Sequence, residues 1–554
     1  MTSVLCQLTS GFFGEPPAKG NFFMGAKKIE CRLPRLSMAS VTLVFILAAC
    51  SDSNNNDRLV DEQKPQADNP VLEGPVTGGG GDDCCIISFS GFPVDLTQPG
   101  LDYKPGTPFY TFLNFDLSDV GYTESEYFFS GSAKSYIATD DLGADGKWNV
   151  QPADAAEYNS RMVVLRPINA DDFNGTVVVE WFNVTGGIDA APDMLQMHTE
   201  FIREGYVWVG VSAQLVGIEG GGAFSLPLKQ VDPTRYEPLF HPGDSFSYDI
   251  FSQAGQAVRH PVGLDPLDGL TVERMIAVGQ SQSAGRLATY VNAIHPTIDL
   301  FDGFIVHGRG SGGASRLSES PQVEISAPRP TFIRDDLPEV VIALQNETDV
   351  LGSVAARQAD SDAYRMWEVT GSAHTDLYTT LTGNADMGDD LTFADVKQKN
   401  DARPPFISCV IPVNDGPGQW VANAAVASLN RWITTGEPAP SAPFMTLNAD
   451  QSDFELDDFG NAKGGIRTPH VDAPVATLRG TGQPPADAFC GLLGTTMRFD
   501  ETKLAELYPD KQAYINAIDA ATDSAVEAGF LLLADGAIIK ARARTSPLPA
   551  AQPD

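Results

Sequence analysis

The sequence predicts an α/β protein with a mostly parallel central sheet and helices on both of its faces. Short apolar runs rich in β-branched residues recur along the chain, at 162–165, 176–182, 206–211, 275–278, 304–306, 340–344 and 366–369. Continuous runs of this length are typical of strands buried on both faces. Segments with a helical pattern lie between several of them, at 248–258 and 283–294. This alternation of strand and helix favours a parallel sheet.

Composition limits the classes of function. The chain has 554 residues, of which 42% are hydrophobic, and a formal net charge of −35. This hydrophobic content is enough for a large core and excludes a wholly disordered chain. Because so acidic a surface repels phosphate backbones, the sequence argues against nucleic-acid binding.

The first fifty residues have the pattern of an export signal. Basic residues between positions 27 and 35 precede an apolar run at 41–47, which is shorter than the roughly 20 residues that span a bilayer. The run ends in Leu47-Ala-Ala-Cys50, which resembles a bacterial lipobox in which the cysteine is lipidated. An ordinary signal peptide with a chance cysteine is the alternative. We predict a signal peptide over residues 1–49 and an exported protein, either anchored to the bacterial outer membrane by a lipid on Cys50 or periplasmic or secreted.

The remaining chain divides into a tether, one domain and a tail. Residues 50–85 are polar and contain a glycine run at 78–81, which predicts a flexible tether. One α/β domain is predicted over residues 86–540. Its long inserts between core strands, near 212–250 and 308–338, are typical of lids. Near its end, apolar residues from 421 to 433 follow helical spacing up to Gly436, and residues 511–533 have the pattern of a further helix. Residues 541–554 are predicted to be a disordered tail.

The cysteines fit an exported protein. Of the seven, two would be removed with the signal peptide and Cys50 would carry the lipid. The rest form an even number in an oxidising compartment: Cys84, Cys85, Cys409 and Cys490. Spacing leaves three pairings open. We favour Cys409–Cys490, with the other two as a vicinal pair or free.

A candidate nucleophile follows the strand 275–278. The chain continues as Gly279-Gln-Ser281-Gln-Ser283 and then enters a helix. This is the strand–turn–helix context of a nucleophile elbow, whose tight turn needs small residues on either side of the serine. Gly279 and Ser283 occupy the small positions, although glycine is usual at the second. Ser281 is therefore the predicted nucleophile, and Ser283 a competitor that would lie inside the helix.

A serine hydroxyl needs a base, and the base needs an acid to orient it. In one large class of serine enzymes the chain order is serine, acid, histidine. His374 lies in a loop of small residues after the strand 366–369. Asp349 and Glu347 follow the strand 340–344. We predict Asp349 as the acid, with Glu347 as the alternative.

An oxyanion hole requires main-chain N–H groups aimed at the developing negative charge. Gln282, the residue after the nucleophile, is the first predicted donor. The second is expected from the loop after the strand 176–182, where Asn183 and Val184 precede two glycines that permit close approach of a substrate.

Several blocks of the sequence resemble a family of bacterial proteins usually called alpha/beta hydrolase domain-containing proteins. The blocks are 178–187, 232–236, 241–249, 279–286, 301–307, 347–349, 373–374 and 465–469. Together they span about residues 90–540. The resemblance implies an α/β-hydrolase fold and hydrolase chemistry, with Ser281, Asp349 and His374 in the triad roles.

These observations predict a serine hydrolase that cleaves small or polymeric carboxylic esters through an acyl-enzyme, without a metal or other cofactor. Contact with a membrane is expected only through the N-terminal lipid, and the oligomeric state stays open. Two alternatives remain. One is a peptidase or amidase that uses the same triad, and the other is a catalytically silent binding protein tethered at the cell surface.

Overall fold

The computed structural model describes residues 97–110, 113–221, 225–310, 312–388, 409–484 and 489–548. The predicted signal peptide, the tether, Cys50, Cys84 and Cys85 lie outside these ranges.

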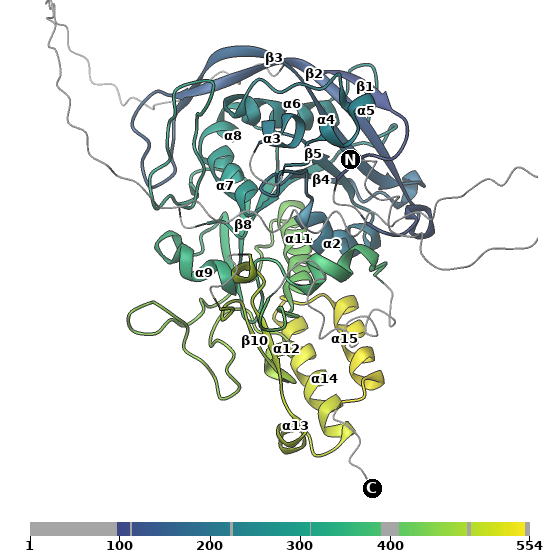
Figure 1. Ribbon diagram of the computed structural model, residues 1–554, viewed down its shortest axis with the longest axis vertical. Coiled ribbons are helices and arrows are strands. Elements are labelled where there is room, and N and C mark those ends of the chain that lie inside the picture. Colours follow the sequence, from purple (N-terminus) through teal and green to yellow (C-terminus); the bar gives the residue numbers. More distant parts are fainter. Residues whose placement is uncertain are drawn as a thin grey trace, which may run out of the picture. The chain divides into compact units, whose positions relative to one another are not determined.

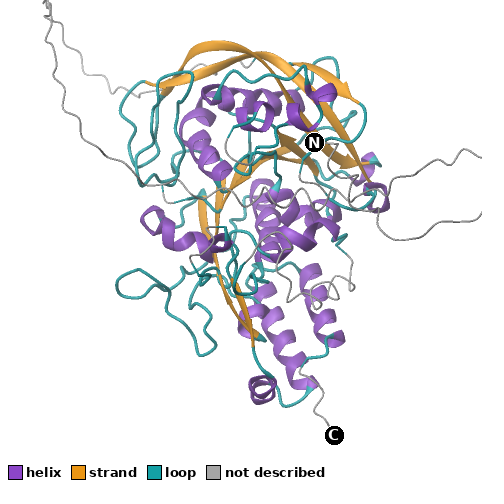
Figure 2. Cartoon of the chain, in the orientation of Figure 1, coloured by secondary structure: helices purple, strands orange, loops and turns teal. Residues whose placement is uncertain are grey.

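A nine-stranded sheet forms the centre of this part of the chain (Figures 1 and 2). Its strand order is β1-β2-β3-β5-β4-β6-β7-β8-β9. The strands are β1 (Gly100–Lys104), β2 (Tyr122–Ala138), β3 (Val150–Pro167), β4 (Thr176–Trp181), β5 (Val207–Val211), β6 (Arg274–Gln280), β7 (Gly303–His307), β8 (Val340–Asn346) and β9 (Tyr364–Val369). From β5 to β9 all neighbours are parallel, whereas β1, β2 and β3 add an antiparallel edge. The predicted mostly parallel sheet is confirmed, and each predicted apolar run falls on one of β3 to β9.

Helices cover both faces of the sheet. Val177 and Val179 of β4 belong to one core cluster, which includes residues of α6 (Ser247–Arg259) and α7 (Gln282–Thr289). Val178 points to the opposite face and joins a second cluster with α2 (Pro192–Arg203) and α11 (Gly418–Thr435). Alternate residues of one strand thus feed two separate cores, which is why these strands read as unbroken apolar runs.

The predicted helices occur with shifted boundaries. The helix after Ser281 continues through a π-helical turn, η4 (Tyr290–Ile294), into α8 (His295–Ile298). α11 ends at Gly436, whose φ of 75° is left-handed and suits glycine. The predicted helix at 511–533 is instead two helices, α14 (Lys511–Glu527) and α15 (Leu533–Thr545).

The predicted start of the tail at residue 541 is wrong, because α15 continues to Thr545. Ile539 and Ala543 pack into a small apolar cluster with Ile518 and Tyr514 of α14. The alternating basic residues of this helix hide its apolar contacts in the sequence. Residues after 548 lie outside the described ranges.

Shorter elements complete the described chain. Within the first predicted insert lie α3 (Leu215–Glu219), α4 (Leu228–Val231), α5 (Pro233–Tyr236) and η3 (Asp244–Phe246). The other short helical turns are η1 (Leu117–Val120), η2 (Ala170–Asp172), α9 (Glu347–Ser353), η5 (Val354–Ala356), η6 (Tyr378–Thr382), η7 (Gly383–Ala385), α12 (Pro469–Asp472), η8 (Cys490–Leu492) and α13 (Glu501–Leu507). A separate two-stranded hairpin consists of β10 (Ala476–Arg479) and β11 (Thr495–Arg498).

Among the helices described here, none has the length and apolar content needed to cross a bilayer.

Candidate active site

Ser281 occupies a strained turn between β6 and α7. Its φ of 63° and ψ of −118° lie in a region that residues with a Cβ rarely adopt. β6 and α7 approach closely here. A Cβ on Gly279 would lie 3.0 Å from Cβ of Ser283 and 3.1 Å from Cδ1 of Leu287. The turn therefore has the geometry of a nucleophile elbow.

The two serines of the motif differ in access. Ser281 is partly exposed, whereas Ser283 is fully buried in the first turn of α7. No described group hydrogen-bonds to Ser283 Oγ. Of the two, only Ser281 has a side chain that a substrate can reach.

Asp349 and His374 form a direct pair. Asp349 Oδ1 lies 2.6 Å from His374 Nδ1, and both side chains are more than nine-tenths buried. Burial by itself lowers the pKa of the His374 imidazole, but the charge of Asp349 and the hydrogen bond to it outweigh this and raise that pKa above its ordinary value. The carboxylate also fixes the ring, since Nδ1 must point toward it.

Glu347, the alternative acid, contacts other groups. Its carboxylate accepts hydrogen bonds from Arg479 Nε at 2.8 Å and from the main-chain N–H groups of Gly371 at 2.9 Å and Gly480 at 3.1 Å. Burial raises the pKa of this carboxyl. The structure thus brings Asp349 to His374, and it places Glu347 in an ion pair with Arg479.

The elbow and the histidine loop are joined through Gln280. Its Nε2 donates to the main-chain oxygen of His374 at 2.7 Å, and the N–H of Ser281 donates to His307 O at 2.8 Å. Gly308 packs against the pair, because a Cβ there would lie 3.0 Å from Asp349 Oδ2 and 3.3 Å from His374 Nδ1. Between the described side chains of Ser281 and His374 no hydrogen bond is formed. Ser281, Asp349 and His374 follow the carboxyl ends of β6, β8 and β9. Because β6, β7, β8 and β9 are parallel neighbours, all three residues lie at the same end of these strands.

The predicted oxyanion donors divide into two groups. The main-chain N–H of Asn183 donates to Ala190 O at 2.9 Å, so its prediction as a donor to substrate is wrong. Its side chain instead donates to Gln280 O at 3.1 Å and accepts from the N–H of Thr185 at 2.8 Å. The N–H groups of Val184 and Gln282 donate to no described acceptor. Val184 and Gln282 therefore stay predicted donors.

Comparison with known proteins identifies the fold family. A family model described as an alpha/beta hydrolase domain matches residues 73–541, most of the chain. The chain belongs to this family. No curated protein matches its sequence.

Solved structures with distant similarity were also found. A glucuronoyl esterase from Solibacter usitatus is 12% identical over 50% of this chain and 82% of its own, with a TM-score of 0.27. Acetyl xylan esterase 1 from Thermoanaerobacterium sp. JW/SL YS485 is 12% identical over 38% of this chain and 53% of its own, with a TM-score of 0.21. A rice cell wall degrading esterase, LipA, from Xanthomonas oryzae is 13% identical over 35% and 44%, with a TM-score of 0.20. The chain thus spans about half the length of the last two, and the family assignment rests on the family model alone.

A second buried pair in this α/β hydrolase was not predicted from the sequence. His307 Nδ1 lies 2.7 Å from Asp193 Oδ1, and His307 Nε2 lies 3.2 Å from Asn346 Nδ2. Glu180 of β4 accepts hydrogen bonds from Trp208 and from the first turn of α2, where Asp193 lies. Burial and then the charge of Asp193 raise the pKa of Glu180 well above its ordinary value. The sequence does contain one indication of a buried polar cluster here, because Glu180 is a charged residue inside an apolar run.

A disulfide stabilises the segments around the histidine loop. Cys409 and Cys490 are bonded, which confirms the favoured pairing. Thr375, next to His374, donates its N–H to Leu492 O at 3.2 Å. Asn414 completes the connection, because its N–H donates to Leu493 O at 2.8 Å and its side chain donates to Gly371 O at 3.1 Å. The loop that contains His374 is therefore held by both segments that the disulfide joins.

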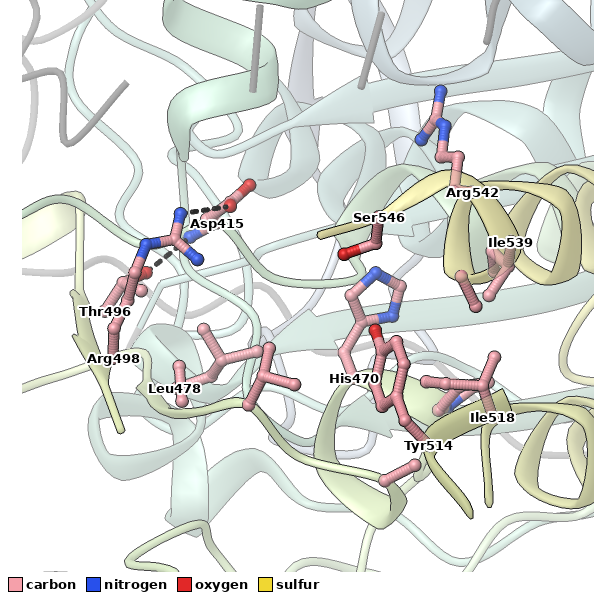
Figure 3. Close-up of a pocket in the computed structure, with 15 residues that line it drawn as sticks. Asp415, His470, Leu478, Thr496, Arg498, Tyr514, Ile518, Ile539, Arg542 and Ser546 are labelled. Carbon is pink, nitrogen blue, oxygen red and sulfur yellow. Dashed lines mark hydrogen bonds and ion pairs between the residues drawn. The ribbon is translucent and has the colours of Figure 1, made fainter. Parts of the chain in front are cut away.

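Two further features lie away from these residues. A pocket of about 180 Å³ opens between the β10–β11 hairpin and helices α12, α14 and α15 (Figure 3). His470, Tyr514 and Arg498 contribute to its wall, and none of the predicted triad residues does. In the part of the chain that the structure describes, one group has the spacing to hold a metal ion, and it consists of His295, Asp299 and Glu339.

Proposed function

We propose that the protein is a serine hydrolase that cleaves carboxylic esters through an acyl-enzyme. The observation that carries the proposal is the 2.6 Å contact between Asp349 and His374, held by Gln280 next to the strained turn of Ser281. An oriented imidazole and a partly exposed serine at a strand–helix turn are the groups from which a nucleophilic hydroxyl is built.

Each group has a role in the proposed reaction. Nε2 of His374 accepts the proton of Ser281 Oγ as this oxygen bonds to the ester carbonyl carbon. Asp349 stabilises the imidazolium that forms. The N–H groups of Val184 and Gln282 donate to the tetrahedral oxyanion. The imidazolium then protonates the departing alcohol. His374 next removes a proton from water as the water oxygen bonds to the acyl carbon, and it returns this proton to Ser281 Oγ when the acyl–oxygen bond breaks, which releases the acid and free Ser281.

The first step requires the hydroxyl and the imidazole to meet. Hydrogen bonds between catalytic groups are often absent in the free enzyme and form when substrate binds. We therefore expect Ser281 Oγ and His374 Nε2 to come within hydrogen-bond distance in a complex with an ester or a transition-state analogue.

The choice of ester over amide rests on leaving-group chemistry and on the fold family. An alcohol leaves more readily than an amine, so ester cleavage demands less from the same general acid. A small or a polymeric ester fits the proposal equally well. A peptidase or amidase that uses the same residues is the second candidate.

A fluorophosphonate probe and a substrate panel test the proposal. The probe should label the wild-type chain and S283A, and it should fail to label S281A. Matched p-nitrophenyl esters and anilides of the same acyl groups should show turnover of the esters in preference. Preferential anilide turnover would favour the amidase. A folded wild-type protein that neither reacts with the probe nor cleaves any substrate would support the silent binding protein.

We also propose that this hydrolase is exported and acts at the bacterial outer membrane. The support is the Leu47-Ala-Ala-Cys50 sequence at the end of a short apolar run. Metabolic labelling with an alkyne-tagged fatty acid should mark the wild-type protein, and C50A should lose the mark and become soluble after export. Equal labelling of C50A would contradict lipid attachment at this cysteine.

A further inference from the structure

The cluster of His295, Asp299 and Glu339 lies near the amino ends of the parallel strands, whereas the candidate active site lies at their carboxyl ends. His295 and Asp299 bound the short helix α8, which precedes β7, and Glu339 directly precedes β8. Ser281 and Asp349 follow the carboxyl ends of β6 and β8. Because these strands are parallel, the cluster is not part of the proposed catalytic machinery.

The imidazole of His295 is held in place by packing. Its side chain is 1% exposed, and its ring packs edge-on against Phe304 with 5.0 Å between centroids and an interplanar angle of 77°. No described group hydrogen-bonds to Nδ1. Nε2 lies 3.3 Å from Glu339 Oε2. The ring therefore presents one nitrogen, in a fixed direction, to the carboxylate.

Asp299 supplies a third ligand atom from the same helical turn. Its N–H donates to His295 O at 2.9 Å, and its φ of 54° turns the chain back at the end of α8. One oxygen or nitrogen from each of the three residues lies within 4.8 Å of the others. Asp299 follows directly after α8, four positions beyond His295, and the turn at the end of this helix keeps the two residues at one site.

The cluster contains two carboxyl groups and one imidazole. No lysine or arginine among the described residues forms an ion pair with Asp299 or Glu339. His295 Nε2 lies against Glu339 Oε2, whereas the carboxylate of Asp299 has no described ion-pair partner. A metal ion, unlike a proton, is shared by three or more ligand atoms.

We propose that His295, Asp299 and Glu339 bind a divalent transition-metal ion, zinc by preference. One imidazole and two carboxylates are ligands that zinc accepts at about 2.0–2.2 Å, and a tetrahedron with such bonds has edges of about 3.4 Å. The 3.3 Å separation of Nε2 and Oε2 matches one edge. Asp299 is exposed, so a water molecule would occupy the fourth coordination position of the metal ion. A bound ion would connect α8 to the start of β8 and stabilise this edge of the sheet.

Metal titration of the full chain tests the site independently of hydrolysis. Metal-free protein is titrated with Zn²⁺ by calorimetry and with Co²⁺ by visible absorption, which reports tetrahedral coordination. The test variants are D299N and E339Q, each of which removes one charged ligand. D268N is the matched control, because Asp268 is also an exposed aspartate with left-handed φ (56°) and lies outside the cluster. The measured quantity is the difference from wild type, so that binding elsewhere on the chain, for instance at cysteines, cancels.

The wild type and D268N should bind one more equivalent of Zn²⁺ than D299N, or bind it at least about tenfold more tightly, and E339Q should resemble D299N. Asp299 is exposed, so D299N is expected to keep the wild-type melting temperature when no metal is present. Isotherms and Co²⁺ spectra that are the same for the wild type, D299N and E339Q would overturn the proposal. Equal losses in D268N and D299N would overturn it as well.

Discussion

The side-chain amide of Gln280 donates a hydrogen bond to the main-chain oxygen of His374, with 2.7 Å between the two atoms. Gln280 is the last residue of β6 and directly precedes Ser281. Its own main-chain oxygen accepts a hydrogen bond from Asn183. One residue thus connects the elbow, the loop of the proposed base and the loop of the proposed oxyanion hole.

Removing this amide should misplace His374 relative to Ser281. We expect Q280A to lower kcat about 10–100-fold with little change in KM, because small displacements of reacting groups cost rates of this order. Steady-state kinetics on a p-nitrophenyl ester measures both constants. Q253A is the matched control, since Gln253 is a buried glutamine of α6 that hydrogen-bonds to Tyr158 and Asp249. An equal fall of kcat in both variants would show that general destabilisation, and not position, is responsible.

The two acids near the histidine loop should respond differently to neutralisation. D349N keeps the shape of the side chain but loses the charge that orients His374, so kcat should fall about 10⁴-fold. E347Q should leave kcat within tenfold of wild type and lower the free energy of unfolding by up to about 3–5 kcal/mol, because it breaks the buried pair with Arg479. Kinetics and denaturant unfolding separate the two effects. Loss of turnover in E347Q alone would make Glu347 the acid.

The raised pKa of His374 predicts the pH dependence of the reaction. Only the neutral imidazole accepts a proton, so kcat/KM should rise with pH through the pKa of His374 in the free enzyme. Since Asp349 raises this pKa, the midpoint should lie above the ordinary value of about 6.5. In D349N the effect of burial remains without the charge, and the midpoint of any residual activity should move to lower pH. A wild-type midpoint below the ordinary value would contradict this account.

The unpartnered hydroxyl of Ser283 should destabilise the fold. We expect S283A to raise the free energy of unfolding by about 1 kcal/mol, because a buried hydroxyl without a hydrogen bond costs free energy relative to a methyl group. Its kcat should stay near the wild-type value. Denaturant unfolding and ester kinetics check the two expectations. A variant without activity would instead give Ser283 a part in the reaction.

The disulfide should support both stability and turnover. Replacing Cys409 and Cys490 together by serine should lower the free energy of unfolding by about 2–5 kcal/mol. It should also reduce kcat, because the segments that hold Thr375 and Gly371 become less constrained. Dithiothreitol should reproduce both effects in the wild type and change nothing in the double variant. Unchanged kcat after complete reduction would limit the disulfide to a role in stability.

The buried part of the sheet could be predicted from the sequence, and its exposed edge could not. Strands β4 to β9 contact helices on both faces, so their apolar runs are continuous. β2 and the first half of β3 form a long antiparallel hairpin that is partly exposed. Most of its apolar residues are separated by polar ones such as Lys134 and Glu157, and a short apolar run at 127–129 covers only a small part of β2.

The position of the candidate residues could be predicted where it follows directly from chain order. Ser281, Asp349 and His374 each come just after a buried strand, and parallel strands bring such positions to one edge. Contacts made across the fold gave no such signal. Asp193 and His307 are 114 residues apart, and the bond between Asn183 and Ala190 depends on how one loop folds back on itself. Such contacts are set by tertiary packing and have no local pattern.

The bond between Cys409 and Cys490 spans 81 residues of chain. Between them lies an exposed, acidic loop at residues 449–453, where a protease has access to the backbone. A cut at this loop would leave both fragments covalently attached to each other. The nicked protein would migrate as a single band in electrophoresis until a thiol reagent separates it into two.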